Sequence, residues 1–339
     1  MNLSLSDDQQ LLRDTARTML AKECPTTLLR AHIDDPTAAD PLWERLRDFA
    51  ALADGPCTDL CLFLEELGYV AAPGVFLPTV ALAAPVLAAA GDERLQSVVD
   101  GTATATLALA GADGTWRTNA EPVKTFVAEA DRVDWIVVVD GGSGTDAEVR
   151  VLAPGDADLR PVGTIDFSRR MFEVEAPSGD AHQVGAAAID AAVIDATIVR
   201  ATVAAAAELV GTARRTFDMS LAYAKERIQF DVPIGSFQAI QHRLAECSLG
   251  VERAIAAVQY AALAVDADDA DQVRAAHVAK AAAGSAATRA AKDAQQVHGG
   301  IGYTWEHDLH LFTRHTYGSE HWLGTTSWHH DRLAELLFD

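Results

Sequence analysis

The sequence predicts an α+β protein with three consecutive regions: an N-terminal helical domain, a short middle β domain and a C-terminal four-helix bundle. Apolar residues recur at helical spacing up to about residue 105 and again from about residue 186 to the end. Between them lie short β-type runs broken by glycine, proline and aspartate. The length of 339 residues is enough for this three-domain organisation.

The first predicted domain spans residues 1–105. Ser6 precedes an amphipathic run, as is typical of a helix N-terminus. Further helical patterns occur around 61–68 and 79–90, and proline and glycine residues separate the two. We therefore expect several short helices here.

The middle domain is expected over residues 106–185, and the last domain over residues 186–339. The predicted strands are short: Thr104–Leu109, Val123–Val127, Trp135–Val139, Val149–Leu152 and Met171–Val174. The last domain is expected to bury the alanine-rich faces of four antiparallel helices against one another. Its predicted helical stretches are 186–226, 236–265, 270–297 and 328–337.

Charge and composition exclude several functional classes. The chain has 27 basic and 49 acidic residues, a formal net charge of −22, which disfavours nucleic acid and anionic membrane surfaces as partners. The acidic beginning of the sequence lacks the features of a signal peptide, and no apolar stretch is long enough to cross a membrane. Its four cysteines form no metal-type pair. We therefore expect a cytoplasmic protein.

Two motifs in the last third of the chain are more specific. Residues 227–246 read RIQFDVPIGSFQAIQHRLAE, and residues 295–303 read QQVHGGIGY. Both resemble motifs of the acyl-CoA dehydrogenase family, R-x-x-F-G-x-P-I-x-x-F-Q-x-x-Q and Q-x-x-G-G-x-G-Y. Residues 5–20, 64–80 and 166–170 also resemble this family. The resemblance thus spans nearly the whole chain and implies the fold of an acyl-CoA dehydrogenase with a truncated β domain.

The resemblance also implies an FAD cofactor shared with a partner subunit. Six residues are expected to bind the adenosine diphosphate half of an FAD held by the neighbouring subunit: Arg227, Phe230, Gln238, Gln296, Gly299 and Gly300. A guanidinium suits a pyrophosphate, and an aromatic ring can wall the cofactor. Glycines without a Cβ let backbone amides approach closely. Asp231 replaces a glycine of the family motif and places a negative charge near the phosphates.

The family's catalytic base is missing from this sequence. Members remove an α-proton and a β-hydride from an acyl-CoA, and a glutamate takes the proton. Leu323 occupies the glutamate position of the E-G-T segment, and Ala201 occupies the alternative position in the first bundle helix. Neither side chain accepts a proton, so no catalytic residue is predicted. Glu320 lies a few residues upstream of Leu323 and is the best substitute base in the sequence.

The β domain also lacks the flavin contacts of the family. No T-E-P segment occurs between Thr102 and Trp116, and residues 126–128 read FVA where the family has W-I-T/S, after a retained Lys124. We therefore expect the chain to complete a partner's FAD site and to hold an FAD of its own poorly.

Other chemistries are less well supported. Seven of the eleven histidines lie between His298 and His330, but the segment WEHDLH at 305–310 matches a packing region of the family, so no metal site is predicted. The sequence has no G-x-S-x-G elbow and no P-loop. The sequence therefore gives no support for a hydrolase or a nucleotide-hydrolysing function.

The leading hypothesis is a subunit of a heteromeric FAD-dependent acyl-CoA dehydrogenase, an α2β2 heterotetramer whose second subunit supplies the glutamate. Similar two-subunit enzymes act on sterol side chains in actinobacteria, which makes a steroid-CoA thioester the expected acyl-CoA substrate. An electron-transfer flavoprotein is the expected electron acceptor. Two alternatives remain: a self-sufficient homo-oligomer with Glu320 as base, and a flavin-free scaffold with the same fold.

Overall fold

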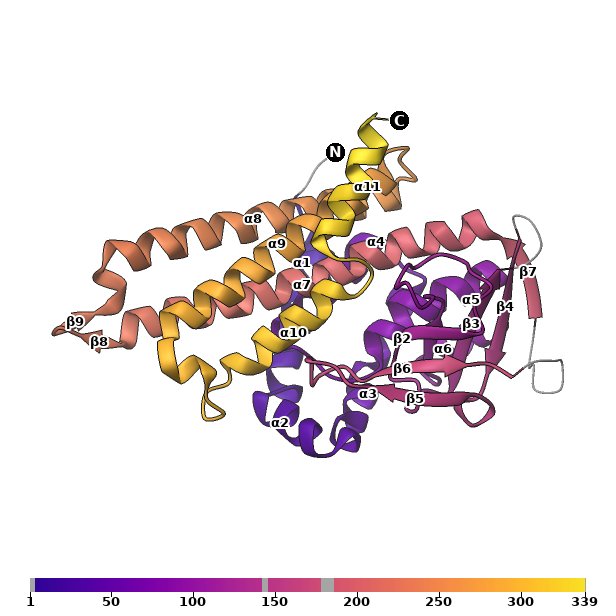
Figure 1. Ribbon diagram of the computed structural model, residues 1–339, viewed down its shortest axis with the longest axis horizontal. Helices are drawn as coiled ribbons and strands as arrows, with labels where there is room; N and C mark the ends of the chain where they lie inside the picture. Colours follow the sequence, from indigo (N-terminus) through magenta and orange to yellow (C-terminus); the bar gives the residue numbers. More distant parts are fainter. Residues whose placement is uncertain (1–3, 142–145, 178–185, 339) are drawn as a thin grey trace.

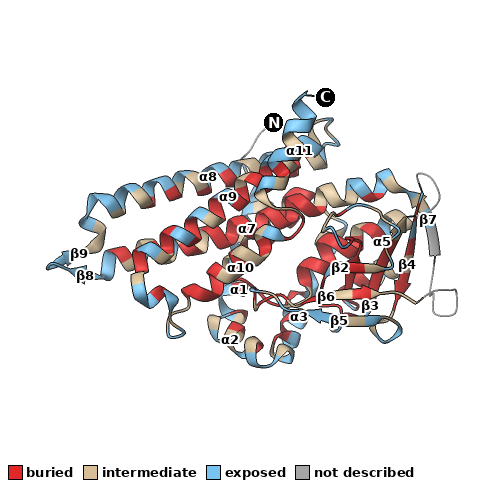
Figure 2. Ribbon diagram, in the orientation of Figure 1, coloured by how far each residue is buried: buried red, intermediate tan, exposed pale blue. Residues whose placement is uncertain are grey.

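The computed structural model describes residues 4–141, 146–177 and 186–338. Figure 1 shows a bundle of long helices, small β-sheets beside one end of it, and shorter N-terminal helices below. Buried residues run continuously from the N-terminal helices into the middle of the bundle (Figure 2). The predicted α+β architecture, with its regions in this order, is confirmed. The exact domain boundaries stay predictions.

The N-terminal region begins with a capped helix. Its α-helices are α1 (Asp7–Glu23), α2 (Thr26–Asp34), α3 (Asp40–Leu46), α4 (Cys57–Tyr69), α5 (Ala84–Ala90) and α6 (Arg94–Val99). Ser6 accepts a hydrogen bond at its Oγ from the backbone N–H of Gln9 at 3.2 Å, and the Gln9 side chain accepts one from the Ser6 N–H at 3.1 Å. This capping box confirms the predicted start of the first helix.

The β region consists of two sheets packed on a small apolar core. The strands are β1 (Ala105–Ala108), β2 (Val123–Ala128), β3 (Trp135–Gly141), β4 (Asp146–Leu152), β5 (Asp158–Val162), β6 (Met171–Glu175) and β7 (Ala186–Asp190). One sheet has the order β1-β3-β4-β7, and the other has the order β2-β6-β5. Strands β1 and β3 are parallel, while the other neighbours in these two sheets are antiparallel.

Two of these strands differ from the expectation. Strand β7 lies where a helix was predicted from residue 186; its alanines pair with β4, and the helix begins only after Asp190, whose side chain accepts a hydrogen bond from the N–H of Ala192 at 2.9 Å. Strand β5 was not predicted, because it is an exposed edge strand containing Pro161 and gives no alternating apolar signal.

The C-terminal region is an antiparallel arrangement of long helices. Its helices are α7 (Ala191–Glu226), α8 (Gln238–Asp266), α9 (Gln272–His298), α10 (Leu309–His321) and α11 (Thr326–Phe338). Alanines fill the contact between the long helices, as predicted; Ala279, Ala283 and Ala287 of α9 are fully buried. Helix α10 was missed because much of its buried face is polar, including His315 and Thr316.

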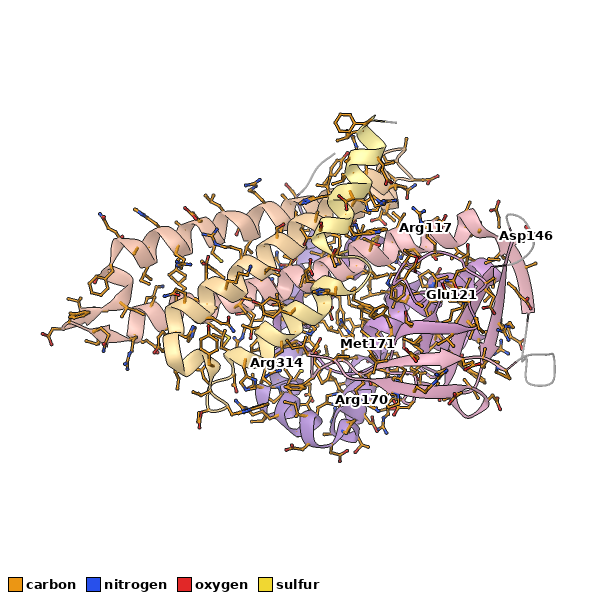
Figure 3. The ribbon with its side chains drawn as sticks, viewed as in Figure 1. Arg117, Glu121, Asp146, Arg170, Met171 and Arg314 are labelled. Carbon is orange, nitrogen blue, oxygen red and sulfur yellow. The ribbon has the colours of Figure 1, made fainter. Side chains whose placement is uncertain are left out.

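Polar side chains join the β region to the bundle. Asp166, Ser168 and Arg169 lie in the segment before β6 and are buried against α7 and α10. Figure 3 labels Arg170 at the end of this segment and Arg314 on α10, on the two sides of the junction. The guanidinium of Arg314 lies 4.6 Å from the ring centre of Phe167. The junction is therefore fixed by specific contacts of the 166–170 segment.

No helix in the described part of the chain combines the length and the apolar character needed to span a bilayer.

Candidate functional site

The first group of predicted site residues begins where α7 ends. Arg227 follows the last residue of this helix, and its backbone closes a hairpin of β8 (Ile228–Gln229) and β9 (Val232–Pro233). The Arg227 N–H donates to the carbonyl of Tyr223 at 2.8 Å, and the Arg227 carbonyl accepts from the N–H of Ile234 at 2.8 Å. The Arg227 side chain is exposed. Its backbone is thus fixed while its guanidinium is open to a ligand.

The tip of this hairpin has an unusual backbone. Phe230 and Asp231 have φ values of +54° and +64°, a left-handed conformation that most residues avoid and that aspartate tolerates better than most. Asp231 therefore maintains a turn for which the family motif uses glycine. The Phe230 side chain is 87% exposed and contacts Phe237 edge-on, at 6.1 Å between ring centres. A ring held in this way is available to another molecule.

The second group lies at the end of α9. Gly299 has φ +63° and ψ −141°, and a Cβ built on either Gly299 or Gly300 would have no atom within 4 Å. Gln296 is exposed in the last turn of α9, and Gln238 is exposed at the first position of α8. The structure therefore leaves open space in front of the glycine pair, as close backbone approach to a ligand requires.

Figure 1 places both groups at the same end of the bundle, the end remote from the chain's own sheets. The six predicted residues are thus brought to one end of the molecule and separated from this chain's β region. A ligand contacting them and a β region at the same time would have to use the β region of another chain.

The predicted base position lies in a different place, at a pocket of about 610 Å³. The pocket is lined by the loop around Trp116, by Phe126, and by parts of α7, α9 and the α10–α11 connection. Leu323 lines it, is 3% exposed and has φ +59°. Ala201, at the alternative position, is buried within α7. Both positions are apolar and contribute no proton acceptor.

Glu320 is engaged elsewhere. Its Oε1 accepts a hydrogen bond from the backbone N–H of Thr326 at 2.7 Å, at the start of α11, and its Oε2 lies 3.2 Å from Nδ1 of His321. Glu320 is not among the residues that line the pocket. Its geometry is that of a helix-capping carboxylate.

A buried lysine holds the α10–α11 connection in place. Nζ of Lys280 donates to the carbonyls of Glu320 and Gly324, both at 2.9 Å, and lies 3.4 Å from that of Ser319. Burial lowers the pKa of Lys280 to about 8. The sequence interpretation missed this residue, although a single lysine within the alanine-rich run AHVAKAAAG was a usable signal.

The retained Lys124 has a structural environment. Its Nζ is buried, donates to the backbone and side-chain oxygens of Asn119 at 2.9 and 2.8 Å, and lies 3.1 Å from Asp140. Phe126, at the position of the family's flavin-covering segment, has φ +56°, and its carbonyl accepts from Nε1 of Trp322 at 3.3 Å. These contacts are internal to the chain and leave the apolar ring of Phe126 on the pocket.

A metal site would need several ligating side chains gathered around one point. Among the residues that the structure describes, no group of three or more histidine, cysteine, aspartate or glutamate side chains is arranged to hold a metal ion. His315, within the histidine-rich region, instead lies 2.9 Å from Asp166 in the buried junction.

The helical, β and helical-bundle regions, with paired motif sites at the far end of the bundle, define a class of fold shared with flavin-dependent dehydrogenases. The model of the acyl-CoA dehydrogenase C-terminal domain matches residues 191–338. Acyl-CoA dehydrogenase IpdE2 of Mycolicibacterium smegmatis is 30% identical over an alignment that covers 98% of this chain and 100% of the relative. The chain belongs to the acyl-CoA dehydrogenase family.

Two solved structures have the same overall fold. The ChsE4–ChsE5 complex from Mycobacterium tuberculosis contains a chain that superposes with a TM-score of 0.85 at 27% identity, with 99% of each chain covered. A chain of the Tcur3481–Tcur3483 steroid acyl-CoA dehydrogenase, in its G363A variant, superposes with a TM-score of 0.86 at 26% identity, with 98% of each chain covered.

Proposed function

We propose that this chain is the base-lacking subunit of a heteromeric, FAD-dependent acyl-CoA dehydrogenase. It would complete an FAD site across an interface, while a second subunit of the same family supplies the catalytic glutamate and the remaining flavin contacts. The chain alone would not dehydrogenate an acyl-CoA.

The observation that carries this proposal is the buried Leu323 at the base position. α-Proton removal needs a group that accepts a proton next to the substrate. Leu323 and Ala201 cannot accept one, and the Glu320 carboxylate already accepts a hydrogen bond from the start of α11. A dehydrogenase built on this chain therefore needs a base from elsewhere.

The other end of the bundle suits the adenosine diphosphate half of the cofactor. FAD, when bound, supplies the hydride acceptor of the family's reaction. The exposed Arg227 guanidinium would form charge-assisted hydrogen bonds to the pyrophosphate, and the open backbone at Gly299 and Gly300 would approach it closely. Phe230 would wall the cofactor, and Gln238 and Gln296 would hydrogen-bond to its polar edges.

The similar proteins support a partner and a substrate class. ChsE4–ChsE5 is a two-component complex, and Tcur3481–Tcur3483 is a steroid acyl-CoA dehydrogenase. By this similarity we propose an α2β2 assembly in the cytoplasm, acting in lipid metabolism on a steroid-CoA thioester. An electron-transfer flavoprotein would be its electron acceptor, as the family resemblance implies.

Counting the cofactor in the assembled protein tests the proposal. The chain is co-expressed with a neighbouring acyl-CoA dehydrogenase gene, and bound FAD is measured by absorbance against protein. We expect one FAD per pair of unlike chains. Two FAD per pair, or stoichiometric FAD and turnover in this chain alone, would overturn the shared-site proposal.

A substitution at Arg227 separates a cofactor role from a scaffold role. Arg227→Gln in the complex should weaken FAD binding about tenfold or more, because a charge-assisted contact to phosphate is lost. Arg253→Gln, at an exposed arginine on α8, is the matched control and should leave FAD content unchanged. Unchanged FAD binding in Arg227→Gln would favour a flavin-free scaffold.

The homo-oligomeric alternative is tested at Glu320. Glu320→Gln retains an oxygen that can accept the hydrogen bond from Thr326, so the fold should be maintained. The proposal expects turnover of the complex to be unchanged, whereas a self-sufficient enzyme using Glu320 would lose its activity.

A further inference from the structure

The pocket beside Leu323 is large enough for a ligand and is lined mainly by apolar side chains. At about 610 Å³ it lies within the usual range for small-molecule sites. Its apolar lining includes Trp116, Phe126, Leu323 and Trp328. Three charged side chains, those of Asp113, Asp195 and Arg117 (the last labelled in Figure 3), also line it, and all three are exposed. The apolar part of the lining therefore suits an uncharged, largely apolar ligand.

Two histidines form a hydrogen-bond chain at this pocket. Nε2 of His329 lies 3.0 Å from the carbonyl oxygen of Leu323, and Nδ1 of His329 lies 2.7 Å from Nδ1 of His277. A carbonyl oxygen can only accept a hydrogen bond, so Nε2 of His329 carries a hydrogen and is the donor in this hydrogen bond. His329 is neutral at neutral pH, because burial and the nearby Lys280 charge lower its pKa to about 3.

This arrangement fixes the tautomer of the second histidine. With its proton on Nε2, neutral His329 offers a lone pair at Nδ1, so Nδ1 of His277 must be the donor. Burial, followed by the charges of Arg332 and Arg117, lowers the pKa of His277 to about 4. His277 is therefore also neutral, and its Nε2 carries a lone pair.

Among the residues that the structure describes, that lone pair has no hydrogen-bond partner. His277 lines the pocket. The imidazole is oriented by its contact with His329, which is held by the Leu323 carbonyl. Lys280 fixes the same connection through the carbonyls on either side. The acceptor is thus preorganised by the fold.

We propose that this pocket binds an uncharged, largely apolar molecule through a hydroxyl group that donates a hydrogen bond to Nε2 of His277. Leu323 beside it offers no base, so the molecule would be bound without being oxidised at this site. The inference needs neither FAD nor a partner subunit, and it stands or falls separately from the function proposed above.

The test uses 2-naphthol, which has a hydroxyl donor, and 2-methoxynaphthalene, which has none. Binding to the full-length chain is measured by isothermal titration calorimetry. We expect one 2-naphthol per chain, bound about three- to tenfold more tightly than the ether, as a single net hydrogen bond predicts. Equal affinities for the two probes would overturn the proposal.

Two variants locate the contact. In His277→Phe, 2-naphthol should bind only as tightly as 2-methoxynaphthalene does. The affinity of the variant for 2-methoxynaphthalene itself should be unchanged. Ala196→Trp changes an exposed residue that lines the pocket. The larger side chain should obstruct the pocket and weaken the binding of both probes. Thermal unfolding verifies that each variant is folded. Unchanged 2-naphthol binding in either folded variant would contradict the assignment.

Discussion

Arg169 and Glu208 form a buried ion pair that joins the β region to the bundle. Nη2 of Arg169 lies 2.5 Å from Oε1 of Glu208, and both side chains are almost fully buried. Arg169 also donates to the Ser319 hydroxyl at 3.1 Å, and its guanidinium lies 4.3 Å from the ring centre of Trp322. One guanidinium thus contacts α7, α10 and the residue before Leu323, linking the β region to the wall of the pocket.

Removing the charge of Glu208 should be strongly destabilising. Glu208→Gln maintains the shape but leaves Arg169 as a buried charge without its closest partner, and breaking such a pair costs about 3–5 kcal/mol. The free energy of unfolding is measured with urea. Glu252→Gln, at an exposed position on α8, is the control and should change it by less than about 0.5 kcal/mol. A loss no larger than in the control would mean that the junction tolerates an unpaired Arg169.

The neighbouring His315 predicts a pH dependence. Burial alone would lower its pKa, but Asp166 at 2.9 Å and the nearby Glu208 outweigh burial and raise it. A raised folded pKa means that the stabilisation is fully present below the unfolded value of about 6.5 and is lost as pH rises through the higher folded value. His315→Asn should therefore cost more stability at about pH 6 than at about pH 9.

The measurement is urea unfolding of both proteins across this range. Burial alone would raise the pKa of Asp166, but His315 and Arg169 lower it to about 2, so the contribution of Asp166 persists above its unfolded pKa and fades only in strong acid. A cost of His315→Asn that is equal at both pH values would show that His315 is neutral in the fold.

Introducing the family's glutamate at position 323 should not enable this chain to oxidise an acyl-CoA. Leu323→Glu places a carboxyl in an apolar, buried position, where its pKa would rise and the protein would lose about 2–4 kcal/mol of stability. Leu323→Met conserves volume and should cost less than about 1.5 kcal/mol. We expect the turnover and FAD content of the complex to match those of the Met variant. Acyl-CoA oxidation by the isolated Glu variant would instead show that a base was all that was missing.

Local sequence patterns were sufficient to predict the order of the three regions. They did not predict helices or strands whose buried residues are polar or whose pairing is non-local. The Ser6 cap and the alanine-rich helices were predictable because their signals lie within a few residues. Helix α10 was not, since polar side chains such as His315 occupy its buried face and their partners lie in another region. The sequence of strand β7 predicts a helix, because alanines carry little strand signal and the pairing of β7 with β4 is non-local.

The site shows the same division. Motif spacing predicted a cofactor role for Arg227 and the glycine pair and an empty base position at Leu323, and these roles stay predictions. It gave no sign of the contact between His277 and His329, which are 52 positions apart and come together only when α11 packs on α9. Contacts of this kind depend on tertiary packing, so no periodicity predicts them.

The crossing of α4 and α7 depends on two glycines and supports the sharpest stability prediction. A Cβ on Gly68 would lie 1.9 Å from the carbonyl oxygen of Glu208, and a Cβ on Gly211 would lie 1.9 Å from that of Glu65. Because the obstructing atoms are backbone, the helices would have to separate, and this would also displace the Glu208 that pairs with Arg169. Gly68→Ala should therefore cost about 3 kcal/mol or more in urea unfolding.

Gly250 offers a matched control on α8, because a Cβ there would have no neighbour within 4 Å. Gly250→Ala should stabilise the protein by about 0.5–1 kcal/mol, since alanine favours a helix and reduces the entropy of the unfolded chain. The two substitutions are chemically identical, so opposite signs would isolate the contact between α4 and α7 as the cause. If Gly68→Ala were as well tolerated as Gly250→Ala, the two helices could not be as close as the structure places them.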